Sequence, residues 1–195
     1  MTVASLLNIT VPGGANGQSA TSQGLLMPKL KWRFRVSLEG FGNGNGNLEL
    51  TKQVVDFTRP NLQFNPQTIE IYNSKVYYAG KPEWQTATLT LRDDASGTIS
   101  NLVGAQIQRQ FDFAEQRSAV AGADYKFLTR FEALDGGNGN IAPNTLEIWE
   151  MYGCFISEAN YNSFEYNSND PATITLTIRY DNALQVAGGN GGTVA

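Results

Sequence analysis

The sequence predicts a mainly β protein: an antiparallel β-sandwich or barrel with one packed α-helix. Two patterns carry this prediction. Several segments alternate apolar and polar residues, as half-buried strands do, and one segment repeats its apolar residues at helical spacing. The 195-residue chain is 41% apolar, which is enough for one core. We expect a single domain at residues 28–183, between a flexible arm at residues 1–27 and a flexible tail at residues 184–195.

The first strand is predicted in KLKWRFRVSLE, residues 29–39, where one face is apolar. The opposite face carries four of the fourteen lysines and arginines of a chain with a formal net charge of −4: Lys29, Lys31, Arg33 and Arg35. An acidic chain thus concentrates positive charge on one strand.

Further strands are predicted at residues 48–57, 67–80, 84–94, 125–133, 145–152 and 172–181. The segment at 67–80 is interpreted as one long strand or a strand that runs into a bent extension. Threonine at alternate positions of 84–94 and 172–181 is typical of an exposed sheet face. The Gly-Asn tracts at 42–47 and 135–140 lack the pattern of calcium or phosphate loops, and we interpret them as hairpin connections.

One helix is predicted from Thr98 to about Arg117, with Ser96 as its N-terminal cap. Its apolar residues recur three and four positions apart: Ile99, Leu102, Val103, Ile107, Phe111 and Ala114. We expect its polar face, which includes Arg109, Asp112 and Glu115, to lie toward solvent or a partner.

The composition argues against catalysis and against dedicated nucleic-acid binding. The chain has no histidine, which excludes a Ser-His-Asp triad, a Cys-His pair and a His-ligated metal. Cys154 lies in an apolar run and is expected to be a small buried residue. Glu147 and Glu150 flank Trp149, but a glycosidase needs two facing carboxylates, which sequence cannot show. We expect no enzyme activity, cofactor, metal, secretion signal or membrane anchor, and the net negative charge disfavours a nucleic-acid binder.

Taken in order, the motifs resemble the tail tube protein of contractile-tailed bacteriophages. The matching pieces run through most of residues 28–184: MPKLKWRFRVSLEG, TRPNLQF, IYNSKVYYAGKPEWQTATLTLRDD, YKFLTRFEALDG, LEIWEMYGCFISEANYNSFEYNSND and ITLTIRYDNA. Their order and spacing carry the resemblance, since no single piece is diagnostic.

The resemblance implies a structural virion protein assembled in the host cytoplasm. Such a subunit closes into a hexameric ring in which two hairpins per subunit build a continuous β-barrel around a lumen, and the rings stack into a tube. The tube conducts DNA from capsid to host inside a contractile sheath. The implied partners are further copies of the chain, the tail sheath protein, a baseplate or tube initiator, the tape measure protein, the tail terminator and, in passage, DNA.

On this interpretation we expect the inner hairpins to pair 48–57 with 67–73 and 125–133 with 145–152. Their polar positions supply the lumen candidates Glu49, Gln53, Thr68, Glu70, Glu132 and Glu147, with Lys126 and Arg130 on the face of Glu132. Because phosphate binding would slow DNA, we expect the basic strand to lie outside the lumen, paired with a neighbouring subunit or the sheath. The candidates for such contacts are Lys31, Arg33, Arg35, Arg109, Asp112 and Glu115. A solvated face that discourages edge aggregation is the alternative for the basic strand.

Two other functions remain open from the sequence. A tube protein of another contractile injection system would share the fold and mechanism and differ in cargo. A monomeric carbohydrate-binding β-sandwich would present Trp84, Trp149 and tyrosines as a binding face.

Overall fold

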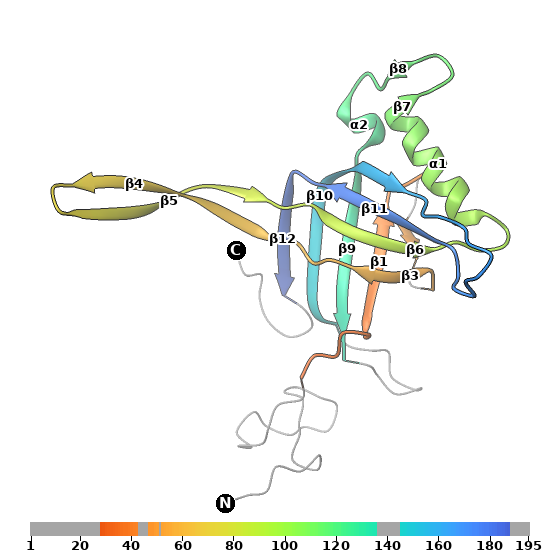
Figure 1. Ribbon diagram of the computed structural model, residues 1–195, viewed down its shortest axis with the longest axis horizontal. Helices are drawn as coiled ribbons and strands as arrows, with labels where there is room; N and C mark the ends of the chain where they lie inside the picture. Colours follow the sequence, from red (N-terminus) through yellow and green to blue (C-terminus); the bar gives the residue numbers. More distant parts are fainter. Residues whose placement is uncertain (1–27, 43–46, 51, 136–144, 188–195) are drawn as a thin grey trace, which may run out of the picture.

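The computed structural model describes residues 28–42, 47–50, 52–135 and 145–187 (Figure 1). The predicted arm at 1–27, much of both Gly-Asn loops and residues 188–195 of the predicted tail lie outside the described residues.

The strands form two antiparallel layers that share one long strand, β10 (Thr145–Asn160). In the first layer the order is β2-β1-β9-β10-β12, and in the second it is β10-β11-β6-β3. The other strands of the first layer are β1 (Phe34–Glu39), β2 (Asn47–Glu49), β9 (Phe127–Leu134) and β12 (Asn182–Ala187). Those of the second layer are β3 (Val54–Phe57), β6 (Ala87–Arg92) and β11 (Thr173–Arg179).

The strand β10 passes from one layer to the other at a bulge between Met151 and Cys154. Gly153 lies in this bulge with φ of 67°, a conformation that residues with a Cβ atom rarely adopt. A Cβ atom at Gly153 would also lie 2.2 Å from Oδ2 of Asp181. Residues up to Tyr152 pair with β9 and β12, Cys154 still pairs with Phe127 of β9, and residues from Phe155 onward pair with β11.

The core lies between the two layers and confirms the predicted alternation. Buried residues of the first layer are Val36, Leu38, Phe131 and Met151, and those of the second are Leu89, Leu91, Leu176 and Ile178. Each such side chain contributes about 1.5–3 kcal/mol by leaving water. The predicted threonine face exists, since Thr90 pairs with Thr175 and Thr88 with Thr177 on the opposite side of the second layer, but these threonines are half-buried and not exposed as predicted.

The helix is shorter than predicted. The helix α1 (Thr98–Gln110) ends at Phe111, whose backbone is extended, and residues up to 118 form a small hairpin of β7 (Phe111–Asp112) and β8 (Arg117–Ser118). The carboxylate of Asp112 accepts hydrogen bonds from the backbone N–H groups of Ala114 and Glu115, which favours a turn over further helix. A one-turn helix, α2 (Gly122–Tyr125), precedes β9.

The predicted cap Ser96 is also wrong. The N-cap position of α1 is Gly97, and Oδ1 of Asp94 accepts the N–H of Thr98 at 2.7 Å. Ser96 instead donates to Asp94, and this hydrogen bond is the main reason that the pKa of Asp94 is lowered.

The segment at 67–80, predicted as one long strand or a strand that runs into a bent extension, belongs instead to a long two-stranded hairpin. It consists of β4 (Leu62–Ile71) and β5 (Ser74–Trp84), joined by a turn at Tyr72 and Asn73, and it extends away from the two layers (Figure 1). The expected pairing of 48–57 with 67–73 is therefore wrong. Residues 48–57 divide into β2 and β3, which pair with β1 and β6.

The second predicted hairpin, 125–133 with 145–152, is confirmed as β9 and β10. Residues 184–187, which we assigned to the tail, belong to β12, because the first half of β10 offers an edge that β11 does not cover.

Candidate functional site

The hairpin β4–β5 exposes an apolar face that no described residue covers. Cross-strand pairing places four apolar side chains on this face: Ile69, Ile71, Val76 and Tyr78. Each is between 46% and 54% exposed. We term these four residues the apolar hairpin face. A continuous apolar surface of this kind marks an interaction site more often than an idle surface.

The predicted lumen residues Thr68 and Glu70 lie on the opposite face of this hairpin. Thr68 pairs across the strands with Tyr77, and Glu70 forms an exposed ion pair with Lys75 at 2.8 Å. This second face is mixed, because Tyr77 and, by alternation along β4, Leu62 and Phe64 share it. Thr68 and Glu70 thus belong to an element separate from β9 and β10.

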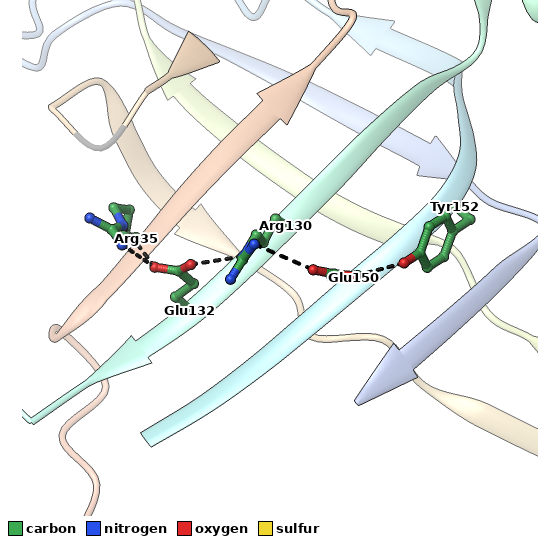
Figure 2. Close-up of polar contacts among 5 residues, drawn as sticks. All are labelled: Arg35, Arg130, Glu132, Glu150 and Tyr152. Atoms are coloured by element: carbon green, nitrogen blue, oxygen red, sulfur yellow. Dashed lines mark hydrogen bonds and ion pairs between the residues drawn. The ribbon is translucent and has the colours of Figure 1, made fainter. Parts of the chain in front are cut away.

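The outward face of the first layer carries a row of ionic contacts across three strands (Figure 2). Arg35 of β1 contacts Glu132 of β9 through Nε, at 2.8 Å from Oε2, and through Nη2. Arg130 of β9 lies between Glu132, at 2.8 Å, and Glu150 of β10, at 3.4 Å. The hydroxyl of Tyr152 donates to Glu150 at 2.6 Å. We term these five residues the ion-pair ladder.

The ion-pair ladder neutralises its own charge, since it contains two arginines and two glutamates. The Glu132 side chain is only 8% exposed beneath Arg35 and Arg130, which are 40% and 39% exposed. A buried carboxylate needs such partners, because an unpaired charge away from water is strongly unfavourable. The hydrogen bond to Glu150 raises the pKa of Tyr152.

The expectations for Arg35 and Glu132 cannot both hold, because these two residues share one sheet face. The sequence predicts Arg35 outside the lumen and Glu132 inside it, whereas their register and ion pair bring the two residues together. The expected position of Arg130 beside Glu132 is confirmed.

Glu147 lies on the opposite face of the first layer from Glu132. In the β9–β10 register Glu132 is the partner of Ile148, so that Glu147, one residue earlier, points to the other side. One sheet face therefore cannot present both carboxylates to the same lumen.

The Glu147 carboxylate is almost completely buried at the end of the strand layers. Nζ of Lys29 and Nε1 of Trp149 each donate to it at 2.5 Å, and Arg59 lies 3.5 Å away. Burial alone raises the pKa of Glu147. The hydrogen bonds from Lys29 and Trp149 and the charges of Lys29 and Arg59 together outweigh burial, and the pKa is held below the ordinary value.

Glu147 lies at one side of a pocket of about 420 Å³, which we term the basic pocket. Four cations line it, Lys29, Lys31, Arg33 and Arg59, with the carboxylates of Asp56 and Glu147. Its apolar wall includes Phe34, Phe57 and Phe131, whose rings stack at 5.4 and 5.9 Å. The basic stripe of the sequence is thus divided: Arg35 belongs to the ion-pair ladder, whereas Lys29, Lys31 and Arg33 line this pocket.

The helix residues predicted to face partners make contacts within the chain. Arg109 donates to the backbone carbonyls of Gly40, Gly42 and Asp124 and so ties α1 to two loops. Asp112 and Glu115 both pair with Arg117 in the β7–β8 hairpin.

The other two lumen candidates lie near strand ends. Glu49 is the last residue of β2, and its backbone pairs with Ser37. Gln53 lies in the turn before β3, where its carbonyl accepts the N–H of Arg92 at 2.7 Å.

Sequence reasoning missed Tyr152 as a member of the ion-pair ladder and considered Glu150 only as a catalytic carboxylate. It also missed Gln106, which is fully buried in α1, accepts the N–H of Gly42 and donates to the carbonyl of Tyr125. A glutamine on the apolar face of a predicted helix is the signal that could have indicated a buried polar contact.

Nothing in the described part of the chain is arranged for metal binding, since no group of three or more metal-ligating side chains occurs there. Cys154 is buried as predicted, and burial raises the pKa of its thiol to about 11. Among the described residues, no helix is long and apolar enough to cross a membrane.

No protein-family model matches the chain, and no curated protein sequence matches it either. Its fold is similar to that of a chain in the cryo-EM structure of the anti-feeding prophage baseplate, with a TM-score of 0.63, 12% identity, and coverage of 84% of this chain and 98% of the other. A chain in the sheath/tube terminator of an extracellular contractile injection system gives a TM-score of 0.61 at 15% identity, with coverage of 83% and 98%. A chain in the anti-feeding prophage tube-terminating cap gives 0.57 at 14% identity, with coverage of 84% and 94%.

The fold is therefore one found in contractile injection systems. This confirms, at the level of the fold, the resemblance to contractile tail tube proteins.

Proposed function

We propose that this chain is the tail tube subunit of a contractile-tailed bacteriophage. It polymerises as stacked hexameric rings into a tube that conducts DNA from the capsid to the host. The role is structural and not catalytic, and the assembled protein belongs to the virion. Its partners in assembly are the sheath protein, the tube initiator of the baseplate, the tape measure protein and the tail terminator.

The apolar hairpin face is the observation that carries the proposal. Four large apolar side chains stay half exposed on an element that extends from the molecule, whereas the apolar side chains of β1, β6 and β11 are largely buried. This exposed apolar surface lowers the solubility of a lone subunit, and a neighbouring subunit that covers it removes it from water. We propose that the covering surface is a second copy of this chain.

The open edges of the first layer support self-association. Within the described residues, β2 and β12 have no partner strand on their outer sides. Pairing the β12 edge of one subunit with the β2 edge of the next would satisfy both edges and extend the layer into a closed barrel.

In such a barrel, the outward face of the first layer lines the lumen. The lumen residues are then Arg35, Arg130, Glu132, Glu150 and Tyr152. Compared with the prediction from sequence, this proposal retains Glu132 as a lumen residue, adds Arg35 and excludes Glu147. Because the glutamates neutralise the arginines, this face has little net positive charge. DNA in contact with it would release few counterions and would therefore bind weakly.

The carbohydrate-binding alternative receives no support from the tryptophans. Trp84 packs against Tyr180 with ring centroids 5.8 Å apart, and Trp149 donates its indole N–H to Glu147. Both rings are committed to packing and do not form an open stacking platform.

Light scattering after size-exclusion chromatography, across a concentration series, tests the proposal. We expect hexamers and larger stacks whose fraction grows with concentration, and six-fold rings in negative-stain images. A monomer at all concentrations that also binds a glycan would contradict the proposal. Genes for capsid and terminase beside the gene for this chain would separate the phage from another contractile injection system.

A further inference from the structure

The basic pocket and one loop of the chain have complementary chemistry. This segment, residues 158–170, comprises the last three residues of β10 and the loop that follows them, and it is exposed throughout except at Ala159. It carries three carboxylates, Glu158, Glu165 and Asp170, and no cation occurs between Arg130 and Arg179. We term this segment the acidic loop.

The acidic loop presents its carboxylates to solvent, and of the three only Asp170 accepts a side-chain hydrogen bond from a described residue, Ser168, at 3.1 Å. None of its three carboxylates has an ion pair among the described residues. Two aromatic residues flank Glu165: Phe164 is 86% exposed and Tyr166 is fully exposed. The loop is anchored, since Asn162 donates to the carbonyl and hydroxyl oxygens of Thr173 at 2.9 Å.

The basic pocket has the opposite properties. Its four cations and two carboxylates leave an excess of two positive charges, and its wall contains three aromatic rings. Lys31 has no ion pair within the described chain, and Nε of Arg33 is buried without a hydrogen-bond partner. A volume of about 420 Å³ falls in the range of about 300–1,000 Å³ that suits a small ligand, so an aromatic side chain fits beside a carboxylate.

We propose that the acidic loop of one subunit docks in the basic pocket of another, with Glu165 paired to Lys31 and an adjacent aromatic ring against the phenylalanine wall. This inference rests on the proposed self-assembly. It gives Lys31 the partner that we expect for the basic strand, an acidic group of a neighbouring copy, whereas Arg33 already donates to the carbonyl of Asp135.

Charge selects the acidic loop over the segments that adjoin the pocket in the chain. Residues 1–27, which precede Lys29, contain no acidic side chain, and neither do residues 136–144 or 188–195. The pocket lies at the start of β1, whereas the acidic loop lies at the end of the molecule opposite the β4–β5 hairpin (Figure 1). Contact between such different surfaces is heterologous, so it propagates from copy to copy.

The test is a charge swap in the full chain. Neither Lys31→Glu nor Glu165→Lys breaks an ion pair seen within the subunit, so both variants should fold. We expect each single change to raise the concentration needed for assembly by about tenfold, and the double variant to return within about threefold of the wild type. The matched control combines Glu165→Lys with Lys52→Glu, which has the same net charge but no complementary pair, and it should not recover.

A crosslinking experiment gives a second measure. Lys31→Cys with Glu165→Cys should form a ladder of linked subunits with a short bismaleimide, whereas each single variant should not. The native Cys154 is buried and should not react.

The outcomes separate the two proposals. A wild-type chain that assembles, with swaps that neither weaken nor restore assembly, would overturn the docking inference alone. If Lys31→Glu weakens assembly and Glu165→Lys does not, another segment or partner occupies the pocket and the loop assignment is wrong. A wild-type chain that stays monomeric at high concentration, even in the presence of the tube initiator, would overturn both.

Discussion

Removing apolar contact from the hairpin should weaken assembly by an amount that the structure predicts. Ile69 and Val76 are cross-strand partners on the apolar hairpin face and are 51% and 46% exposed. The double variant Ile69→Ala with Val76→Ala removes three carbon atoms from Ile69 and two from Val76. At about 0.8 kcal/mol per buried CH₂, and with half of each side chain still available for burial, the loss is about 2 kcal/mol per interface.

A loss of about 2 kcal/mol corresponds to about a 25-fold higher concentration for half-assembly, because 1.4 kcal/mol is tenfold. Sedimentation velocity across a dilution series measures this concentration. Circular dichroism during thermal unfolding checks that the variant remains folded.

The matched control is Thr68→Ala on the opposite face of β4, the strand that carries Ile69. It shares the lower strand propensity of alanine but removes nothing from the apolar face. If the double variant and the control assemble at the same concentration as the wild type, the apolar hairpin face is not an interface and the reasoning fails.

Three further predictions concern the ladder, the core and pH. The double variant Glu132→Gln with Glu150→Gln leaves Arg35 and Arg130 unneutralised, which adds about twelve positive charges to a six-membered ring. Tubes assembled from this variant should retain DNA, and the retention should fall steeply with salt. The control variant Glu83→Gln with Glu115→Gln makes the same change in net charge and should not retain DNA. Gln106→Ala should cost about 2–4 kcal/mol in urea unfolding, because it leaves the N–H of Gly42 and the carbonyl of Tyr125 without partners, whereas Gln108→Ala on the exposed face should cost far less. Folding lowers the pKa of Glu147, so this residue stabilises the fold fully above the ordinary glutamate pKa and loses that contribution as pH falls through the folded pKa. Glu147→Gln should therefore weaken the fall of the free energy of unfolding with decreasing pH. An unchanged acid dependence would contradict this account.

The alternation of apolar residues was sufficient to predict the strands that form the core. Val36 and Leu38 of β1, and Leu89 and Leu91 of β6, are buried where the pattern placed them. The register between strands does not follow from this pattern. The ion pair between Arg35 and Glu132 joins residues 97 positions apart and depends on how β1 pairs with β9.

The sequence contains a signal of the hairpin turn in the positions of its apolar residues. Ile69 and Ile71 lie at odd positions, whereas Val76 and Tyr78 lie at even positions, and this change of parity occurs at Tyr72 and Asn73. A two-residue turn pairs the residues on either side of it, three positions apart, so it moves one face from odd to even numbers. A straight strand would have kept the parity.

The end of the helix was missed because apolar spacing continued beyond it. Phe111 and Ala114 extend the helical pattern, but the side chain of Asp112 competes for backbone N–H groups and stabilises a turn. The opposite faces of Glu132 and Glu147 could not be predicted either. A bulge between Thr145 and Glu147 shifts the pairing of β10 with β9, so that Glu132 pairs with Ile148, and the sequence does not show this bulge.

Cryo-EM reconstruction of the assembled protein tests the central claim most directly. We predict stacked six-membered rings in which β2 and β12 of adjacent subunits pair and the ion-pair ladder lines the channel. Rings that place the ladder on the outer surface would contradict the lumen assignment. Particles that remain single subunits at high concentration, in the presence of the tube initiator, would contradict the proposed tube function itself.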